Sequence, residues 1–156
     1  MIHEIKKWAL RAALMLSVII LGIAVCLADI NDDLFQAIFH RDVGKVKSLL
    51  SAGADANART RILSGTYISA LYAAVTYANI DMVKMLLQKG ADVNFREEQS
   101  GNTPLLLASL QGRAEIARML LAKGAEVNAR DRLLNETPLM TAAFANRFAI
   151  FYSIGY

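Results

Sequence analysis

The chain has 156 residues, 55% of them hydrophobic, and it carries a formal net charge of +3. The segment before Asp29 holds three Lys/Arg residues and one Glu, so it supplies +2 of that charge. The remaining chain is nearly neutral, which argues against the clustered basic face of a nucleic-acid-binding domain. The single cysteine, Cys26, excludes a disulfide within the chain.

The sequence begins with a positively charged stretch that is followed by an uncharged one. Lys6, Lys7 and Arg11 precede a run of 17 uncharged residues that ends at Ala28. This order of charged, apolar and small residues is typical of a secretory signal peptide. We therefore predict that residues 1–28 are a signal peptide and that the rest of the chain is exported.

The same segment allows three other interpretations. The uncharged run is at the short limit for a spanning helix, so residues 1–28 are alternatively an uncleaved anchor in the inner membrane. Cys26 offers a lipidation site, although Val25 is larger than the residue expected before a lipidated cysteine. The last alternative is a buried helix that caps the following fold. Signal and anchor give the same topology, because positively charged residues stay inside.

A phrase made of a leucine pair, two further residues and Gly-Ala returns three times after this segment. Its glycines, Gly53, Gly90 and Gly124, are 37 and then 34 residues apart. A sustained period in this range indicates stacked supersecondary units rather than one compact core. Glycine adopts the left-handed conformation that ends many helices, so each phrase predicts a helix that ends before its glycine.

A second phrase marks the start of an earlier helix in each unit. Thr103-Pro104-Leu105 returns as Thr137-Pro138-Leu139, and Ser69-Ala70-Leu71 stands in the same place one unit before. A Thr or Ser side chain accepts hydrogen bonds from the free amides of a helix start, and proline suits the first helical position. Apolar residues spaced by three and four, such as Val83 and Leu86, then predict a second helix.

These two phrases resemble the ankyrin repeat, and the resemblance covers about residues 32–154. It implies an all-α solenoid of helix–turn–helix units with hairpin-like loops, over residues 29–156. The units fall at about 32–65, 66–99 and 100–133, with a partial unit at 134–156.

The chain departs from the ankyrin pattern in two ways. The histidine that follows Pro-Leu in the family is replaced by Phe35, Tyr72, Leu106 and Met140. The loop after Asn57 is three residues longer than the corresponding loop after Asn94, so residues 60–67 elaborate one hairpin tip. Insertions in repeat arrays lie on one loop face, which is often the binding face.

The residue inventory argues against catalysis. Beyond residue 28 the only histidine is His40, and no cysteine remains. A zinc site needs three or four ligands that include His or Cys, and a Ser-His-Asp arrangement would have to use His40 as its base. His40 is expected at the end of a helix, where an imidazolium suits the helix dipole. The acidic pair Glu97-Glu98 is expected in a solvated turn. We predict no enzyme activity, no metal site and no cofactor.

The resemblance implies that a protein partner meets the hairpin tips and the exposed side of the first helices. By position, this surface contains Phe39, His40, Tyr77, Leu107, Leu110, Gln111 and Phe144 on the helices, with Arg96 and Arg130 at the tips. Residues at equivalent positions, here called the inner row, are Phe39, Thr76, Leu110 and Phe144. Exposed apolar area often marks an interaction site. The alternatives are that the inner row packs against a neighbouring helix and that the arginines form a solvated edge of mixed charge.

The C-terminal end has a composition of its own. Its last thirteen residues contain five aromatic residues and one charged residue, Arg147. The aromatic residues are Phe144, Phe148, Phe151, Tyr152 and Tyr156. Terminal repeats need a polar outer face for solubility, which this end lacks. One interpretation is a docking surface, either for a partner or for a second copy of the chain. The other is a truncated or degenerate last repeat whose helix is poorly stable.

The sequence therefore favours an exported, non-catalytic protein-binding module, similar to short periplasmic ankyrin-repeat proteins of bacteria. The expected location is the periplasm, or the inner membrane with the repeats facing the periplasm. A membrane-anchored scaffold and a secreted effector that acts on host proteins are the alternatives. A small enzyme would require His40 to be essential.

Overall fold

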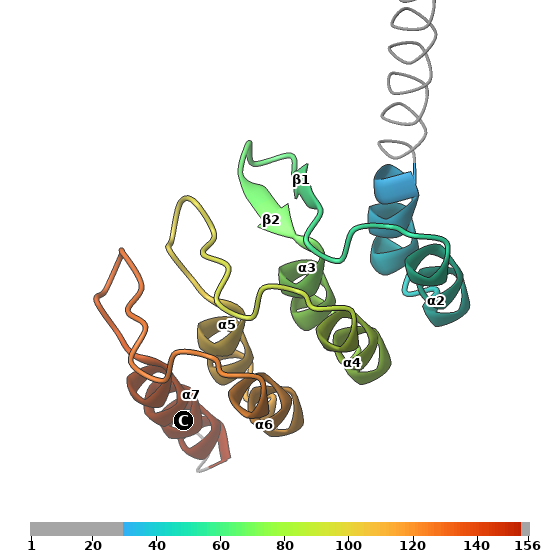
Figure 1. Ribbon diagram of the computed structural model, residues 1–156. Coiled ribbons are helices and arrows are strands. Elements are labelled where there is room, and N and C mark those ends of the chain that lie inside the picture. Colours follow the sequence, from blue (N-terminus) through green and yellow to red (C-terminus); the bar gives the residue numbers. More distant parts are fainter. Residues whose placement is uncertain (1–29, 154–156) are drawn as a thin grey trace, which may run out of the picture.

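The structure of the chain is a computed structural model that describes residues 30–153. Its helices form a row of pairs, and the loops that join the pairs project from the same side of the row (Figure 1). The elements are a helix over residues 30–39, α2 (Val43–Ser51), β1 (Arg59–Arg61), β2 (Tyr67–Ser69), α3 (Ala70–Thr76), α4 (Ile80–Gln88), α5 (Pro104–Leu110), α6 (Ala114–Ala122) and α7 (Pro138–Ser153). This succession of short helices confirms the predicted all-α repeat fold.

The predicted signal peptide or anchor, residues 1–28, lies outside the described residues. Within residues 30–153, no helix is both long enough and apolar enough to cross a bilayer. Export and membrane attachment therefore stay predictions from the sequence.

The first helix of each later unit begins at its predicted hydroxyl cap. Ser69 Oγ accepts a hydrogen bond from the Tyr72 amide at 3.1 Å, and Thr103 Oγ1 accepts one from the Leu106 amide at 3.2 Å. Thr137 caps the start of α7 in the same way. These side chains satisfy amides that have no acceptor inside the helix, which fixes where each helix begins.

The second helices end as the glycine phrase predicts. Gly53, Gly90 and Gly124 have φ values of 102°, 80° and 85°, in the left-handed region. The amide that follows the glycine then turns back to the helix, as where Ala91 N donates to Leu86 O at 3.0 Å. This closure satisfies a carbonyl of the last turn and sends the chain into the loop.

The hydrophobic core runs along the whole row. Leu34, Leu71 and Leu105 occupy equivalent positions and are 0%, 0% and 3% exposed. α3 packs against α5, and α4 packs against α6. Ala74 and Ala108 are fully buried, and their small side chains let neighbouring first helices approach closely.

Asparagines join successive units through backbone groups. Asn57 Nδ2 donates to Gly90 O at 3.2 Å, and its Oδ1 accepts from the Asp92 amide at 2.7 Å. Asn94 repeats the pattern one unit later, with bonds of 3.3 Å to Gly124 O and 2.9 Å from the Glu126 amide. Each asparagine therefore fixes the position of the next unit, a role that the sequence did not reveal.

The elaborated tip at residues 60–67 forms a short β-hairpin. β1 and β2 pair antiparallel, with Thr60 opposite Ile68. Arg61 Nε closes the turn by donating to Gly65 O at 2.9 Å. The extra residues thus extend one loop into a small sheet without changing the helical stack.

The fourth unit differs from the others in its helix. α7 has 16 residues, whereas α3 and α5 have seven each. The earlier units turn into their second helix at Arg41, Ala78 and Gly112, which have φ values of 58°, 53° and 66°. α7 instead continues as helix through Asn146, the equivalent position. Up to residue 153, the fourth unit therefore has no separate second helix.

Candidate interaction surface

The N-terminal part of the inner row is built from aromatic contacts. Phe39 and Tyr77 meet edge to face, with ring centroids 6.0 Å apart, and Phe39 also lies 6.0 Å from Phe35. The Arg41 guanidinium lies 5.4 Å from the Tyr77 ring centroid, within the range of a cation–π interaction. Phe39 and Tyr77 are only half-buried, so their remaining edges reach the surface.

Further along the row, the apolar side chains are more exposed. Leu110 is 52% exposed and Phe144 is 53% exposed, although they occupy equivalent positions 34 residues apart. Thr76 is also exposed, while its hydroxyl donates to the Tyr72 carbonyl within the same helix. The structure therefore places this part of the inner row at the surface instead of packing it under a neighbouring helix.

Leu107, which was predicted to lie on the interaction surface, is buried instead. Its side chain is only 9% exposed and belongs to the hydrophobic core. Leu107 lies one helical turn before Leu110, but it faces the neighbouring units, whereas Leu110 faces outward. Helical spacing alone does not separate these two sides, because both belong to one apolar stripe.

His40 lies at the end of the first described helix, as predicted. Its side chain is exposed, and Nδ1 is 2.8 Å from the Gln36 carbonyl of the same helix. It borders an open depression of about 290 Å³ together with Asp42 and Lys45. Among the described residues, no group of three or more His, Cys, Asp or Glu side chains could hold a metal ion.

Gln111 links two units and leaves one polar atom unused. Its Nε2 donates to the Thr76 carbonyl at 3.4 Å, across 35 residues of sequence. Its Oε1 is buried and has no hydrogen-bond partner among the described residues. A buried acceptor without a donor is energetically costly, so the Gln111 side chain gains a hydrogen bond if it turns outward.

The tip arginines are tied to the protein itself. Arg96 Nη1 donates to the Arg130 carbonyl at 3.0 Å, and its Nη2 lies 3.4 Å from Glu126 Oε2. Arg130 Nη1 in turn donates to the Asn135 carbonyl at 2.7 Å. Both arginines stay exposed, but these bonds brace neighbouring loops and fix their side chains.

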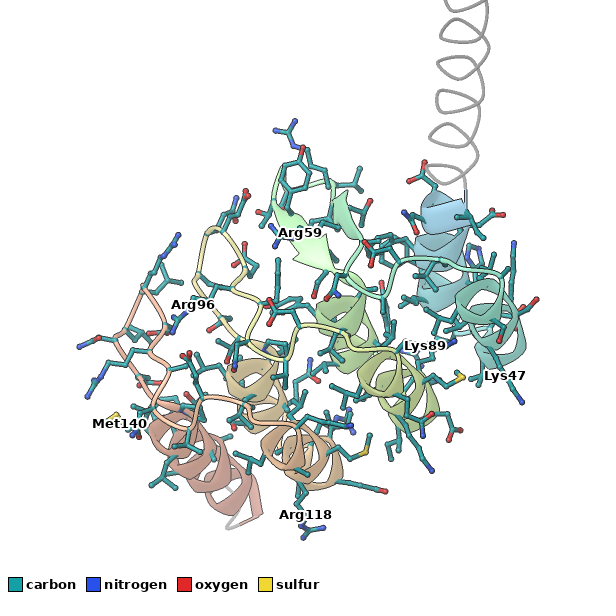
Figure 2. All side chains as sticks on the ribbon, in the orientation of Figure 1. Lys47, Arg59, Lys89, Arg96, Arg118 and Met140 are labelled. Carbon is teal, nitrogen blue, oxygen red and sulfur yellow. The ribbon has the colours of Figure 1, made fainter. Side chains whose placement is uncertain are left out.

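A second pair of arginines acts similarly. Arg59 stacks over Phe95, with 5.2 Å between its guanidinium carbon and the ring centroid, and Arg132 Nη1 donates to the Glu98 carbonyl. Figure 2 shows Arg59 and Arg96 among the loops, while Lys47, Lys89 and Arg118 lie on the side of the second helices. The cations of the loops and those of the helices thus lie on different parts of the surface.

Exposed leucines at the loop tips were missed by the sequence reasoning. Leu63 is fully exposed at the β-hairpin turn, and Leu133 and Leu134 are 73% and 71% exposed in the last loop. Large apolar residues in loop segments that otherwise hold turn-forming and charged residues would have indicated exposed leucines. These leucines add apolar area to the side from which the loops project.

Glu97 is buried, which corrects the prediction of a solvated acidic turn. It is 6% exposed, and its carboxylate accepts bonds from the Gln99 and Ser100 amides at 2.8 and 2.7 Å and from the Ser100 hydroxyl. Burial alone would raise the pKa of Glu97. The hydrogen bonds, with a contribution from the charge of Arg132, outweigh burial and lower that pKa below 4.5. Glu97 is therefore a structural cap of its loop.

Tyr72 occupies the position of the family's histidine. Burial, reinforced by the negative charge of Glu97, raises the pKa of Tyr72 from 10.0 to about 12, although a hydrogen bond with Asn102 acts in the opposite direction. The Tyr72 and Phe95 rings meet edge to face at 6.2 Å. An aromatic contact has thus taken the place of the missing imidazole.

A comparison with protein families agrees with this geometry. The family model "Ankyrin repeats (3 copies)" matches residues 34–131, which is more than half of the chain. A search of curated proteins gives no match. Ankyrin repeats generally serve as protein–protein interaction modules. The repeated caps, the glycine helix ends and the family match together establish that this chain belongs to the ankyrin-repeat family.

Proposed function

We propose that this chain is a non-catalytic scaffold that binds a protein partner through the inner row and the adjacent loop tips. The observation that carries the proposal is the exposure of Leu110 and Phe144 on successive units, each more than half open to solvent. Exposed apolar side chains that recur in line are a feature of docking surfaces.

The polar side chain of Gln111, beside the inner row, can add a directional hydrogen bond to the apolar contacts. Gln111 Oε1 needs a donor, and it lies one residue after Leu110. A partner that draws the Gln111 side chain outward and presents an N–H next to an apolar group would satisfy this oxygen and cover Leu110 at once. Such a combination of an apolar anchor and a buried hydrogen bond gives specificity at the centre of an interface.

The tips extend the proposed surface. Because Arg96 and Arg130 are already braced by backbone carbonyls, they present fixed cations and lose little side-chain freedom when a partner binds. Leu63, Leu133 and Leu134 add apolar contacts on the same side. The proposed partner therefore has an apolar patch that is flanked by acidic groups.

Affinity capture of the full tagged chain from the cells that produce it tests this surface. We expect Leu110→Glu and Phe144→Glu each to lose the proteins that the unaltered chain retains. Ile80→Glu is the matched control, since Ile80 is 38% exposed but lies at the start of α4, outside the row. Equal capture by Leu110→Glu and Ile80→Glu, with unchanged helical circular dichroism, would refute docking on the inner row.

We further propose that the repeats act outside the cytoplasm, with residues 1–28 as a cleaved signal. The support is the order of charged, apolar and small residues in the sequence. Mass measurement of the protein from cell fractions tests this. A chain that begins at Asp29 in the periplasmic fraction supports export, and an envelope-bound chain that begins at Met1 indicates the anchored scaffold. Recovery of the protein in the medium would favour the secreted effector, and an intact chain in the cytosol would contradict export.

A further inference from the structure

The C-terminal end of the row leaves an apolar face uncovered. Leu87 of α4 is 6% exposed, whereas Leu121, the equivalent residue of α6, is 43% exposed. Leu105 of α5 is 3% exposed, whereas Leu139 of α7 is 78% exposed. The same residue types at the same positions are therefore buried in the middle of the row and open at its end.

The uncovered face contains a groove. It encloses about 230 Å³, and its lining residues are Leu105, Ser109, Ala117, Leu121, Val127, Pro138, Leu139 and Ala142. Figure 1 shows the second helices α2, α4 and α6 in a row that ends beside α7, and up to residue 153 no separate second helix follows α6. The groove lies where the second helix of a fourth unit would pack, because α2 packs on α4 and α4 packs on α6.

The chain carries a segment with the pattern of that missing helix. Residues 148–153 are in register with residues 114–119 of α6, 34 positions earlier. Ile150 then corresponds to the buried Ile116, and Phe151 corresponds to Ala117 in the apolar stripe. This segment does not turn back into the groove, since it continues α7 as one uninterrupted helix up to Ser153. At 1.5 Å per residue, α7 is about 24 Å long, compared with about 10 Å for α5.

The first unit differs from the later units at two positions that head-to-tail stacking of copies would use. Asn31 Oδ1 accepts from the Asp55 amide at 2.8 Å, in the place that Asn57 and Asn94 fill for the later units. Ser48 is polar and exposed where the later units carry Met85 and Met119. At these two positions the first unit offers the groove of another copy neither a free amide nor an apolar side chain, which argues against head-to-tail stacking.

We propose that two copies of this chain exchange the C-terminal halves of α7, so that residues 146–153 of each copy occupy the groove of the other. α7 stays helical at Asn146, the position where the earlier units turn into their second helix. Its C-terminal half can therefore extend from one copy into the next. Such an exchange is reciprocal and closes about a two-fold axis. It covers Leu121, Val127 and Leu139 in both copies without requiring a bend in α7.

Crosslinking between two differently tagged full-length copies tests the exchange. Leu50 and Met85 line one hollow between α2 and α4. The equivalent pair at the end of the row is Leu121 and Ser153. One copy carries Leu121→Cys and the other Ser153→Cys, both with Cys26→Ser, and a short bis-maleimide joins cysteines that are close. We expect a linked product with both tags and a doubled mass, and the same result with Val127→Cys in place of Leu121→Cys.

The matched control replaces Leu121→Cys by Leu63→Cys, because Leu63 is fully exposed at the distant β-hairpin. Linkage no stronger than in this control, for both Leu121→Cys and Val127→Cys, would overturn the proposal and leave the groove to a different protein. A chain that carries both cysteines and links them within itself, without a change in mass, would also overturn it, because the segment would then fold back on its own groove. Each result is independent of capture through the inner row.

Discussion

The asparagine bonds between units lead to a specific prediction for Asn94→Ala. Asn94 makes two bonds to the next unit, at 3.3 Å to Gly124 O and 2.9 Å from the Glu126 amide. A hydrogen bond contributes about 1 kcal/mol net to stability, so the loss of both costs about 2 kcal/mol. For a chain of this length, that corresponds to a fall in Tm of roughly 4–8 °C.

Thermal unfolding followed by circular dichroism measures the effect. Asn128→Ala is the matched control, because Asn128 has the same register but is followed by no complete unit within residues 30–153. We expect this control to change stability by less than about 0.5 kcal/mol, as is usual for exposed positions. If Asn94→Ala and Asn128→Ala unfold at the same temperature, the asparagines do not hold the units together and the reasoning fails.

Three further predictions concern caps and titratable groups. Thr103→Ala removes the buried cap of α5 and should lower the free energy of unfolding by about 1–2 kcal/mol in urea titrations, with Thr103→Ser restoring most of it. The folded pKa of Glu97 lies below 4.5, so this carboxylate stabilises the fold fully above pH 4.5, and its contribution is lost as pH falls through the folded pKa. Acid unfolding of Glu97→Gln should lack this loss. An acid unfolding profile of Glu97→Gln equal to that of the unaltered chain would contradict the prediction. Because the pKa of Tyr72 is raised from 10.0 to about 12, stability should decline as pH rises between these values, and Tyr72→Phe should unfold with a weaker dependence on alkaline pH. A Tyr72 that titrates spectroscopically near pH 10 in the folded protein would refute the last prediction.

The parts of the fold that follow from local chemistry could be predicted from the sequence. A Thr or Ser cap acts on an amide three residues away, and a glycine helix end acts within one turn. Thr103 and Gly90 therefore predicted a helix start and a helix end independently of how the units stack. The all-α repeat fold followed from their recurrence.

Interactions across the 34-residue period were not predictable in the same way. The Arg96–Arg130 bond and the asparagine bonds join groups that become neighbours only once the units are stacked. The burial of Leu107 also depends on which side of its helix faces the next unit, and periodicity does not decide that. Glu97 was misread because its acidic neighbour suggested solvent, while its own carboxylate caps backbone amides.

Amide hydrogen exchange of the full chain, with and without a captured partner, tests most directly the claim that this array works by presenting its inner row. We predict that partner binding slows exchange at the C-terminal ends of the first helices, at residues 73–77 and 107–111, and in the loops beside them. Slower exchange that is confined to the second helices α4 and α6, with the inner row unaffected, would contradict the account.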